Sequence, residues 1–251
     1  MLREETVFGP IHSRRLGNSL GVNLLPRDGK VCNFDCIYCE CDWNKDGTGG
    51  EALPTAAQVR GALEDKLAAL LLEGTSIDSI TFSGDGEPTL NPEFPRIIDD
   101  TLALRDAYCP LAKVSVLSNA TRAHVPEVFQ ALAKVDNPIL KIDAPTNSLV
   151  NLINRPAPGY DVARVVDALR RFNGNFCLQT MFLRSPGFCS TSPEVLDGWK
   201  GIVRELRPRQ IMVYTIDRPT PQGGLEKLTP AQMRAAVRDL LEEGFNIQIC
   251  G

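Results

Sequence analysis

The stretch Val31-Cys-Asn-Phe-Asp-Cys-Ile-Tyr-Cys-Glu-Cys41 places four cysteines within ten residues. Cys32, Cys36 and Cys39 have the spacing C-x₃-C-x₂-C. Three thiolates on so short a loop can each bind one iron of a [4Fe–4S] cluster, which usually takes four cysteine ligands. The fourth iron then keeps an open position for a small chelating ligand. The loop therefore predicts an iron–sulfur site that can pass an electron to a bound molecule.

A structural zinc site is the competing interpretation of this loop. Structural zinc takes four protein ligands, usually as two separated pairs. His12 and His124 are the only histidines, and they have no partner at such a spacing. The remaining cysteines are single: Cys109, Cys177, Cys189 and Cys250. Ordinary core cysteines are a third interpretation, although Asn, Asp and Glu surround these thiols. Spacing alone favours the cluster and leaves zinc open.

Composition predicts an ordinary globular protein. The chain has 251 residues, 43% of them hydrophobic and 23% charged, which is enough for one large α/β domain or two small ones. No apolar run reaches the ~18 residues of a membrane span, and acidic residues stand where a signal peptide needs apolar ones. We therefore expect a cytoplasmic protein with reduced cysteines. A net charge of −4 does not favour a large nucleic-acid footprint.

Strand and helix patterns alternate along the chain. We expect strands at 20–26, 79–83, 113–117, 139–143, 175–183, 210–216 and 245–250, and a Gly-rich loop at 43–54. We expect helices from Thr55 onward and at 94–107, 125–134, 149–153, 161–172, 193–205 and 230–243. Thr55 with Gln58 and Thr229 with Gln232 have the pattern of capping boxes, and Ser192 is a candidate N-cap. This alternation predicts a parallel sheet, either open and doubly wound or an incomplete barrel.

Polar residues follow three of these strands at their C-terminal ends. They are Gly84 to Pro88, Ser118 with Asn119, and Asp143. In a curved parallel sheet the chemistry gathers at this edge. Each group also has a structural interpretation: a tight turn before Pro88, a cap for the following helix at Ser118 and Asn119, and a buried ion pair of Asp143 with Lys141. The glycines can also let a ligand approach the backbone.

The segment Cys32 to Cys39, with the aromatic Tyr38 before the last cysteine, resembles the signature of the radical S-adenosylmethionine (radical SAM) superfamily. The resemblance implies a partial (β/α)6 TIM-like barrel of parallel strands. It implies a single domain over 1–251, with an irregular segment at 1–19, the barrel at 20–228, and a helix and short strand at 229–251. It also implies one [4Fe–4S] cluster and SAM as cofactors, with SAM chelated at the open iron.

The resemblance extends to SAM-binding residues. In the family a Gly-Gly-Glu-like motif after the second strand holds the amino group of SAM, and residues after the third strand approach its carboxylate or ribose. An Asp at a strand end can bind ribose hydroxyls, and a Lys can meet a carboxylate. The residues implied are Tyr38, Gly84, Asp85, Gly86, Glu87, Ser118, Asn119, Lys141 and Asp143. The turn has one residue more than the family motif.

Three loops resemble one branch of the superfamily, the small uncharacterised proteins grouped with archaeal-type wyosine synthase. These loops lie at 9–17, 153–156 and 214–219. Wyosine synthase carries a second cluster on cysteines upstream of the signature, and here no cysteine precedes Cys32. We therefore expect a single cluster. The candidates to face a substrate are Cys41, Arg155, Tyr214 and Arg218. For Cys41 three roles are open, namely facing the substrate, tuning the cluster, or having no part in the site, and the last is favoured.

The expected activity is reductive cleavage of SAM to a 5′-deoxyadenosyl radical that abstracts hydrogen from a substrate. The substrate is a nucleoside, an RNA base or another small molecule. An activase that installs a glycyl radical on a partner enzyme is the alternative, and a non-catalytic zinc- or cluster-binding protein is the alternative of another class. A reductant such as flavodoxin or ferredoxin is the expected partner. No side chain is identified as an acid or base.

Overall fold

The structure is a computed structural model that describes residues 2–13, 15–44 and 50–251. Residues 45–49 of the predicted Gly-rich loop lie outside the described residues. The chain forms two compact units. The first contains Met1–Cys32, Asn44–Ser118 and Val125–Pro138, and the second contains Asn33–Trp43, Asn119–His124 and Ile139–Gly251. The predicted single domain over 1–251 stays a prediction.

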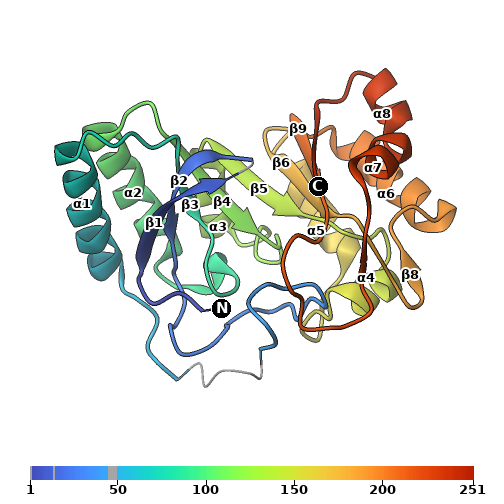
Figure 1. The fold of residues 1–251 in the computed structure, drawn as a ribbon, viewed down its shortest axis with the longest axis horizontal. Helices are drawn as coiled ribbons and strands as arrows, with labels where there is room; N and C mark the ends of the chain where they lie inside the picture. Colours follow the sequence, from blue (N-terminus) through green and yellow to red (C-terminus); the bar gives the residue numbers. More distant parts are fainter. Residues whose placement is uncertain (1, 14, 45–49) are drawn as a thin grey trace. The chain divides into compact units, whose positions relative to one another are not determined.

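The first unit holds a four-stranded part of a sheet in the order β1-β2-β3-β4 (Figure 1). Its strands are β1 (Val7–Ser13), β2 (Gly17–Val22), β3 (Ser79–Phe82) and β4 (Lys113–Ser118). Strands β2, β3 and β4 are parallel, with Leu20 beside Ile80 and Ile80 beside Val114. All three of these side chains are fully buried, so continuous apolar strands form the core, as is typical of parallel sheets.

Strand β1 corrects the prediction of an irregular segment at 1–19. Val7–Ser13 pairs antiparallel with β2, and the register shifts between Phe8 and Ile11. Turn-forming Gly9 and Pro10 lie within that shift, which is why the sequence did not read as a strand. The Phe8 ring packs over Gly21, where a Cβ would lie 2.2 Å from it. A contact with a glycine on the neighbouring strand therefore helps to fix the pairing.

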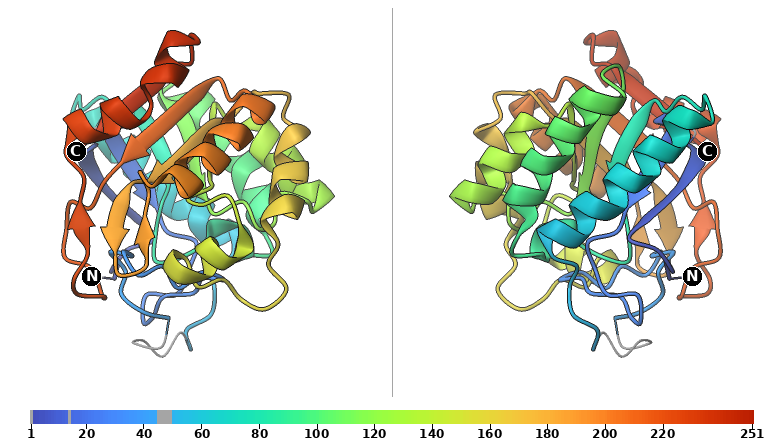
Figure 2. Two further views of the ribbon diagram at one scale, coloured as in Figure 1. Left: turned by 90° about the vertical axis from the view of Figure 1, so that its right-hand side faces the viewer. Right: turned by 90° about the vertical axis from the view of Figure 1, so that its left-hand side faces the viewer.

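Helices α1 (Ala56–Leu72), α2 (Phe94–Tyr108) and α3 (Pro126–Lys134) belong to the same unit, which also has a short 3₁₀ turn at Pro88–Leu90. Thr55 forms the predicted capping box with Gln58. One face of α1 is buried: Ala56, Val59, Leu63, Leu67 and Leu70. The right-hand view of Figure 2 shows α1 and α2 side by side. The helical periodicity predicts this face correctly at Val59, Leu63, Leu67 and Leu70 but wrongly includes Leu71, which is 62% exposed.

The second unit holds parallel strands in the order β5-β6-β9-β11, with β5 belonging to it from Ile139 onward. They are β5 (Asn137–Lys141), β6 (Cys177–Met181), β9 (Gln210–Tyr214) and β11 (Ile247–Cys250). The helices of this unit are α4 (Asn147–Ile153), α5 (Val162–Arg170), α6 (Pro193–Leu206), α7 (Pro230–Ala236) and α8 (Arg238–Glu242). The left-hand view of Figure 2 shows α5 beside α6. The alternation predicted from 139 onward is confirmed in type and order.

Three details of the second unit differ from the prediction. The strand expected at 175–183 ends at Met181, and a small antiparallel sheet of β7 (Leu183–Ser185), β8 (Phe188–Cys189) and β10 (Glu226–Lys227) follows. The last helix is divided at Val237. Ser192 occupies the N-cap of α6 without a side-chain cap bond, because its hydroxyl donates to the carbonyl of Cys189 (2.9 Å). The second capping box, at Thr229, is confirmed.

Within the described ranges, no helix combines the length and the apolar composition that crossing a lipid bilayer requires.

Candidate functional site

The cysteine loop combines one buried and two half-buried thiols. Cys36 is buried, and Cys32 and Cys39 are half-buried. All eight cysteines of the chain lie among the described residues, and none forms a disulfide. Burial raises the pKa of the Cys36 thiol to about 11, against the opposing effects of the Lys141 charge and a hydrogen bond from Asn154. An anionic sulfur at this position therefore needs compensating positive charge or hydrogen-bond donors.

Within the second unit, the loop is held by the segment that follows α4. Phe34 forms an antiparallel bridge with Pro156. Three backbone bonds run alongside this bridge: Asp35 N to Asn154 O (2.8 Å), Ile37 N to Ile153 O (2.9 Å) and Ala157 N to Asn33 O (2.8 Å). Residues 33–37 and 153–157 thus pair like two short strands. The conformation of the loop is fixed by main-chain bonds, which do not depend on a bound group.

Asn154 joins this pairing to a buried polar network. Its Nδ2 donates to the Sγ of Cys36 (3.3 Å), to the hydroxyl of Tyr38 (2.9 Å) and to Oδ2 of Asp143 (2.7 Å). The hydroxyl of Tyr38 donates to the same carboxylate oxygen. Asn154 is 1% exposed. A single amide therefore connects a cysteine of the motif to the carboxylate that follows β5.

Lys141 and Asp143 form the pair expected from their alternation along the strand. Lys141 Nζ lies 3.6 Å from Asp143 Oδ2, with the two side chains 14% and 0% exposed. The ammonium also donates to the hydroxyls of Tyr38 (3.0 Å) and Tyr214 (2.6 Å). Burial alone would lower the pKa of Lys141, but Asp143 and Tyr214 hold it above its usual range. The other carboxylate oxygen of Asp143 accepts from Met181 N (2.8 Å).

Two of the residues that we expected to face a substrate, Arg155 and Arg218, contact the end of the cysteine loop. The guanidinium of Arg155 lies 4.7 Å from the centre of the Trp43 ring and donates to Gln222 Oε1 (2.7 Å). Arg218 donates to Glu40 (2.8 Å). Tyr214 accepts from Lys141 (2.6 Å), and Cys41 is half-buried. These arginines therefore brace residues 40–43 from loops far along the chain.

In the first unit, the turn after β3 is built around Glu87. Glu87 is 2% exposed. Its Oε1 accepts from Thr89 N (3.1 Å), Thr89 Oγ1 (2.6 Å) and Ser118 Oγ (2.8 Å). Ser118 thus bonds the neighbouring turn and does not cap a helix, because the N-cap of α3 is Val125. Glu87 and Ser118, which the sequence predicted on one edge, are in direct contact.

The two glycines of this turn meet the protein's own backbone and side chains. A Cβ on Gly86 would lie 1.9 Å from the carbonyl oxygen of Val31, and one on Gly84 would lie 2.0 Å from Asn23 Oδ1. Val31 and Gly86 form a parallel bridge, with bonds from Val31 N to Asp85 O (3.0 Å) and Glu87 N to Val31 O (3.1 Å). Asn23 also donates to the Asp85 carboxylate (3.0 Å). The close approach that these glycines allow is therefore to residues 23 and 31.

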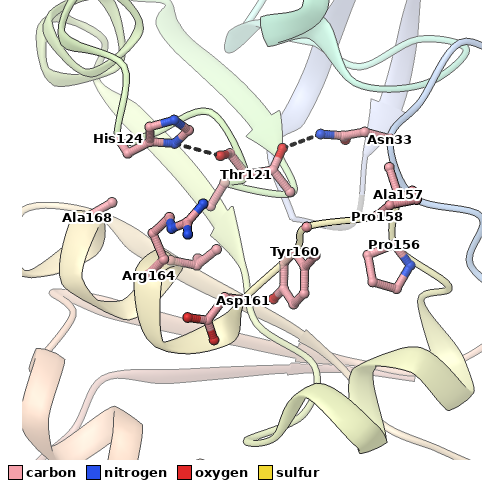
Figure 3. A pocket seen from close by; sticks show the side chains of 13 residues that line it. Asn33, Thr121, His124, Pro156, Ala157, Pro158, Tyr160, Asp161, Arg164 and Ala168 are labelled. Atoms are coloured by element: carbon pink, nitrogen blue, oxygen red, sulfur yellow. Dashed lines mark hydrogen bonds between the residues drawn. The ribbon is translucent and has the colours of Figure 1, made fainter.

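Asn119 bonds two residues, Asn33 and Thr121, that line a cavity of the second unit. It donates to Asn33 Oδ1 (2.6 Å) and accepts from Thr121 Oγ1 (2.7 Å). Figure 3 shows Asn33 bonded to Thr121, and Arg164 reaching from α5 towards Thr121 and His124. The cavity here has a volume of about 160 Å³. It adjoins Asn33, the residue that follows Cys32, so Asn119 supports the cysteine loop from this side.

Over the residues that the structure describes, no group of three or more His, Cys, Asp or Glu side chains is gathered closely enough to hold a single metal ion. The cysteine loop itself supplies soft thiolate ligands of the kind that iron–sulfur clusters take. The buried Cys36 sulfur has a hydrogen-bond donor in Asn154 and a nearby cation in Lys141. The donor set of the loop therefore fits an iron–sulfur cluster.

Sequence reasoning missed the residues that connect the predicted ones. Asn154, Asn23 and Thr89 carry the contacts of the cysteine loop and of the Glu87 turn. The loop at 153–156, which contains an Arg-Pro pair, is one of the three that resemble a branch of the superfamily, but its asparagine was not predicted as a site residue. An Asn before an Arg-Pro pair in a candidate site loop is the signal that was present in the sequence.

Comparisons with known proteins agree with this geometry. Residues 28–185 match the Radical SAM superfamily. A Brachyspira hyodysenteriae protein named GTPase Obg is 29% identical over 99% of this chain and 35% of its own length. A Helicobacter pylori UPF0026 protein is 28% identical over 85% of this chain and 67% of its own. The chain thus spans about a third of the first relative and about two thirds of the second.

A solved structure extends the comparison to the fold. Streptococcus suis SuiB bound to S-adenosylmethionine superposes with a TM-score of 0.66 at 17% identity, over 92% of this chain and 50% of that one. Together with the parallel strands, this likeness confirms the predicted α/β class and partial (β/α)6 barrel. Because the family match covers more than half of the chain and includes the cysteine loop, the chain belongs to the radical SAM superfamily of enzymes, which use an iron–sulfur cluster and S-adenosylmethionine.

Proposed function

We propose that the chain binds one [4Fe–4S] cluster through Cys32, Cys36 and Cys39 and cleaves SAM reductively to start a radical reaction. The observation that carries this proposal is the loop at Cys36, whose buried sulfur accepts a hydrogen bond from Asn154 Nδ2 (3.3 Å). When bound, the cluster and SAM supply the electron, the C–S cleavage and the hydrogen abstraction. The protein holds the ligands and excludes water.

The residues around the cysteine loop fix its conformation through main-chain and side-chain contacts. Main-chain pairing of 33–37 with 153–157 fixes the loop, as the bond from Asp35 N to Asn154 O (2.8 Å) shows. Arg155 stacks on Trp43, and Arg218 pairs with Glu40 at the end of the loop. A loop fixed in this way keeps its sulfurs in place when the cluster changes charge, which lowers the reorganisation needed for electron transfer. We expect this rigidity to be the contribution of the loop to electron transfer.

We also propose that SAM lies against the polar residues at the strand ends. These residues are Tyr38, Gly84, Asp85, Gly86, Glu87, Ser118, Asn119, Lys141 and Asp143. Glu87 and Asp143 are buried and accept hydrogen bonds within their own units. Their contacts therefore support a role in holding the turns, with SAM meeting the backbone and the remaining polar groups.

Anaerobic reconstitution tests the proposal. The protein is loaded with iron and sulfide, and iron is counted per chain. It is then reduced with SAM present, and 5′-deoxyadenosine is measured. We expect four irons and deoxyadenosine formation. Cys36→Ser should lose both, whereas the matched variant Cys109→Ser, which changes a cysteine of the first unit outside the loop, should retain both.

The zinc alternative predicts the opposite result. One zinc per chain with no SAM cleavage would contradict the enzyme proposal. Deoxyadenosine formation by the Cys36→Ser variant would contradict the ligand assignment. The two failures are separate, because the first is read from the parent protein and the second only from the variant.

We propose a small molecule, nucleoside or RNA base as the substrate and a flavodoxin or ferredoxin as the reductant. Deoxyadenosine release on adding RNA or nucleosides supports the first class. Release that needs a protein fraction, with loss of hydrogen from a glycine of that protein, supports the glycyl-radical activase. Replacing a chemical reductant by reduced flavodoxin tests the electron donor.

A further inference from the structure

The side chain of Asn154 contacts the sulfur of Cys36, although the main chain of Asn154 already holds the cysteine loop. Its backbone carbonyl already accepts from Asp35 N (2.8 Å). Its side-chain Nδ2 lies 3.3 Å from the Sγ of Cys36, within the range of an N–H to sulfur hydrogen bond. Both residues are buried, Asn154 at 1% and Cys36 at 9% exposure. Water is therefore a poor substitute for this donor.

The orientation of the amide is set by its other partners. Asp143 Oδ2 at 2.7 Å accepts from Nδ2, and the Tyr38 hydroxyl at 2.9 Å also accepts from it. Only the NH₂ end of an asparagine amide can donate to a carboxylate, so Asp143 excludes the flipped amide. An amide has two N–H bonds, and its Nδ2 has three acceptors within reach: the sulfur, the phenol and the carboxylate. The group that faces the sulfur is thus a donor.

The residue that follows Asn154 has an uncommon backbone conformation. Asn154 ends α4, and Arg155 has a φ of 44° in the left-handed region. That conformation is uncommon for a residue with a side chain, and local strain of this kind clusters at functional sites. The Arg155 guanidinium is anchored on Trp43 (4.7 Å) and Gln222 (2.7 Å). These contacts hold the turn that presents Asn154.

We propose that Asn154 is a positioning residue of the cluster, whose amide donates to the Cys36 sulfur and raises the reduction potential of the cluster. The inference rests on the proposed function. Hydrogen bonds to ligating sulfur are one of the factors that set the potentials of iron–sulfur clusters. A donor stabilises the more electron-rich, reduced state more than the oxidised state. Loss of the donor therefore makes the cluster harder to reduce.

The test is a redox titration of the reconstituted full chain, followed by EPR of the reduced cluster. Asn154→Leu keeps the size of the side chain and removes the donor, and we expect a more negative midpoint potential with iron content unchanged. Asn147→Leu is the matched control, because Asn147 begins the same helix and its amide bonds Asp161 (3.1 Å) instead of the sulfur. The control should keep the parent potential. Equal potentials in Asn154→Leu and the parent would overturn the inference.

A second measurement can overturn the inference on the parent protein alone. Parent protein labelled with ¹⁵N-asparagine should show a nitrogen hyperfine coupling to the reduced cluster in pulsed EPR. Asn154→Ser, a milder change, should lose that coupling. If the labelled parent shows no asparagine coupling, the inference is wrong even though the cluster is present. If the parent binds no cluster, the proposed function fails and this inference with it.

Discussion

The turn after β3 and the network after β5 both place a buried carboxylate beyond a parallel strand, yet they are built differently. Glu87 accepts from neutral donors, two of them on Thr89 at a separation of two residues. Asp143 accepts from Tyr38 and Asn154 and faces the ammonium of Lys141 (3.6 Å). The first turn depends on glycine and close backbone contact, whereas the network depends on long-range side chains and charge. Substitutions should therefore destabilise the turn after β3 and the network after β5 for different reasons.

Because the two regions are built differently, they should tolerate different kinds of substitution. A backbone turn packed against Val31 tolerates no added side chain at Gly86. A side-chain network can lose one member and still fold, at a cost that depends on the charge left behind. We therefore expect added side-chain volume to lower the free energy of unfolding most in the turn after β3. Removal of a charge should lower it most in the network after β5.

The largest expected loss of stability is that of a substitution at Gly86. In Gly86→Ala the new Cβ would lie 1.9 Å from the Val31 carbonyl, at a φ of 142°. Backbone atoms cannot move aside as a side chain would, so we expect a loss of more than about 4 kcal/mol in the free energy of unfolding. Urea denaturation of the apo protein measures it.

Gly61→Ala is the control for this substitution. Gly61 lies within α1, and nothing is within 4 Å of its Cβ position. Alanine favours a helix interior by up to about 1 kcal/mol over glycine, so this variant should be slightly more stable. A Gly86→Ala protein as stable as Gly61→Ala would show that the β3 turn adapts, and the contrast with the network would disappear.

The next effect is at Asp143. Asp143→Asn leaves the Lys141 ammonium, 14% exposed, without its carboxylate. Breaking a buried pair by removing one partner costs about 3–5 kcal/mol. The double variant Asp143→Asn with Lys141→Met should recover part of this loss in urea denaturation, because no charge is then stranded. Strictly additive losses would contradict the coupling.

A smaller effect is expected at Glu87. In Glu87→Gln the amide oxygen can still accept from Thr89 and Ser118. We expect a loss of about 1 kcal/mol, the difference between hydrogen bonds to charged and neutral acceptors. The same denaturation experiment compares it with Asp143→Asn. A cost as large as that of Asp143→Asn would mean that charge matters equally in both turns.

The smallest effect is at Asp136, a half-exposed carboxylate of the first unit. Burial would raise its pKa, but the bonds from Val114 N (2.9 Å) and Arg105 (2.7 Å) hold the pKa below its usual value. Its stabilising contribution is therefore complete above the unfolded carboxylate pKa of about 3.9. The contribution is lost as the pH falls through the lower folded value.

Asp136→Asn should remove this part of the acid-induced destabilisation. We expect about 1 kcal/mol or less, because the pair is partly solvated. Thermal unfolding measured from neutral to acidic pH should show a flatter acid limb for the variant than for the parent. A variant curve parallel to that of the parent would show that Asp136 does not contribute.

The cysteine motif and the alternation of strands and helices were predictable because they depend on local spacing and periodicity, and the family was predictable from the motif that resembles its signature. The spacing of Cys32, Cys36 and Cys39 and the apolar face of α1 are examples. Strand β1 was not predicted, since turn-forming residues lie inside it and only its pairing with β2 makes it a strand. The Lys141 and Asp143 pair was predictable because side chains alternate along a strand.

The residue types at the ends of the strands and the thiol loop can be read from the amino-acid sequence. Which of these residues touch depends on how the chain packs in three dimensions. Asn154 meets Cys36 across 118 positions of the chain, and Asn23 meets Asp85 across 62. Such partners are chosen by packing, because a buried polar group takes whichever donor or acceptor the fold brings within reach. Short-range sequence patterns therefore predict helices and strands, whereas long-range packing brings the asparagine side chain to the cysteine sulfur.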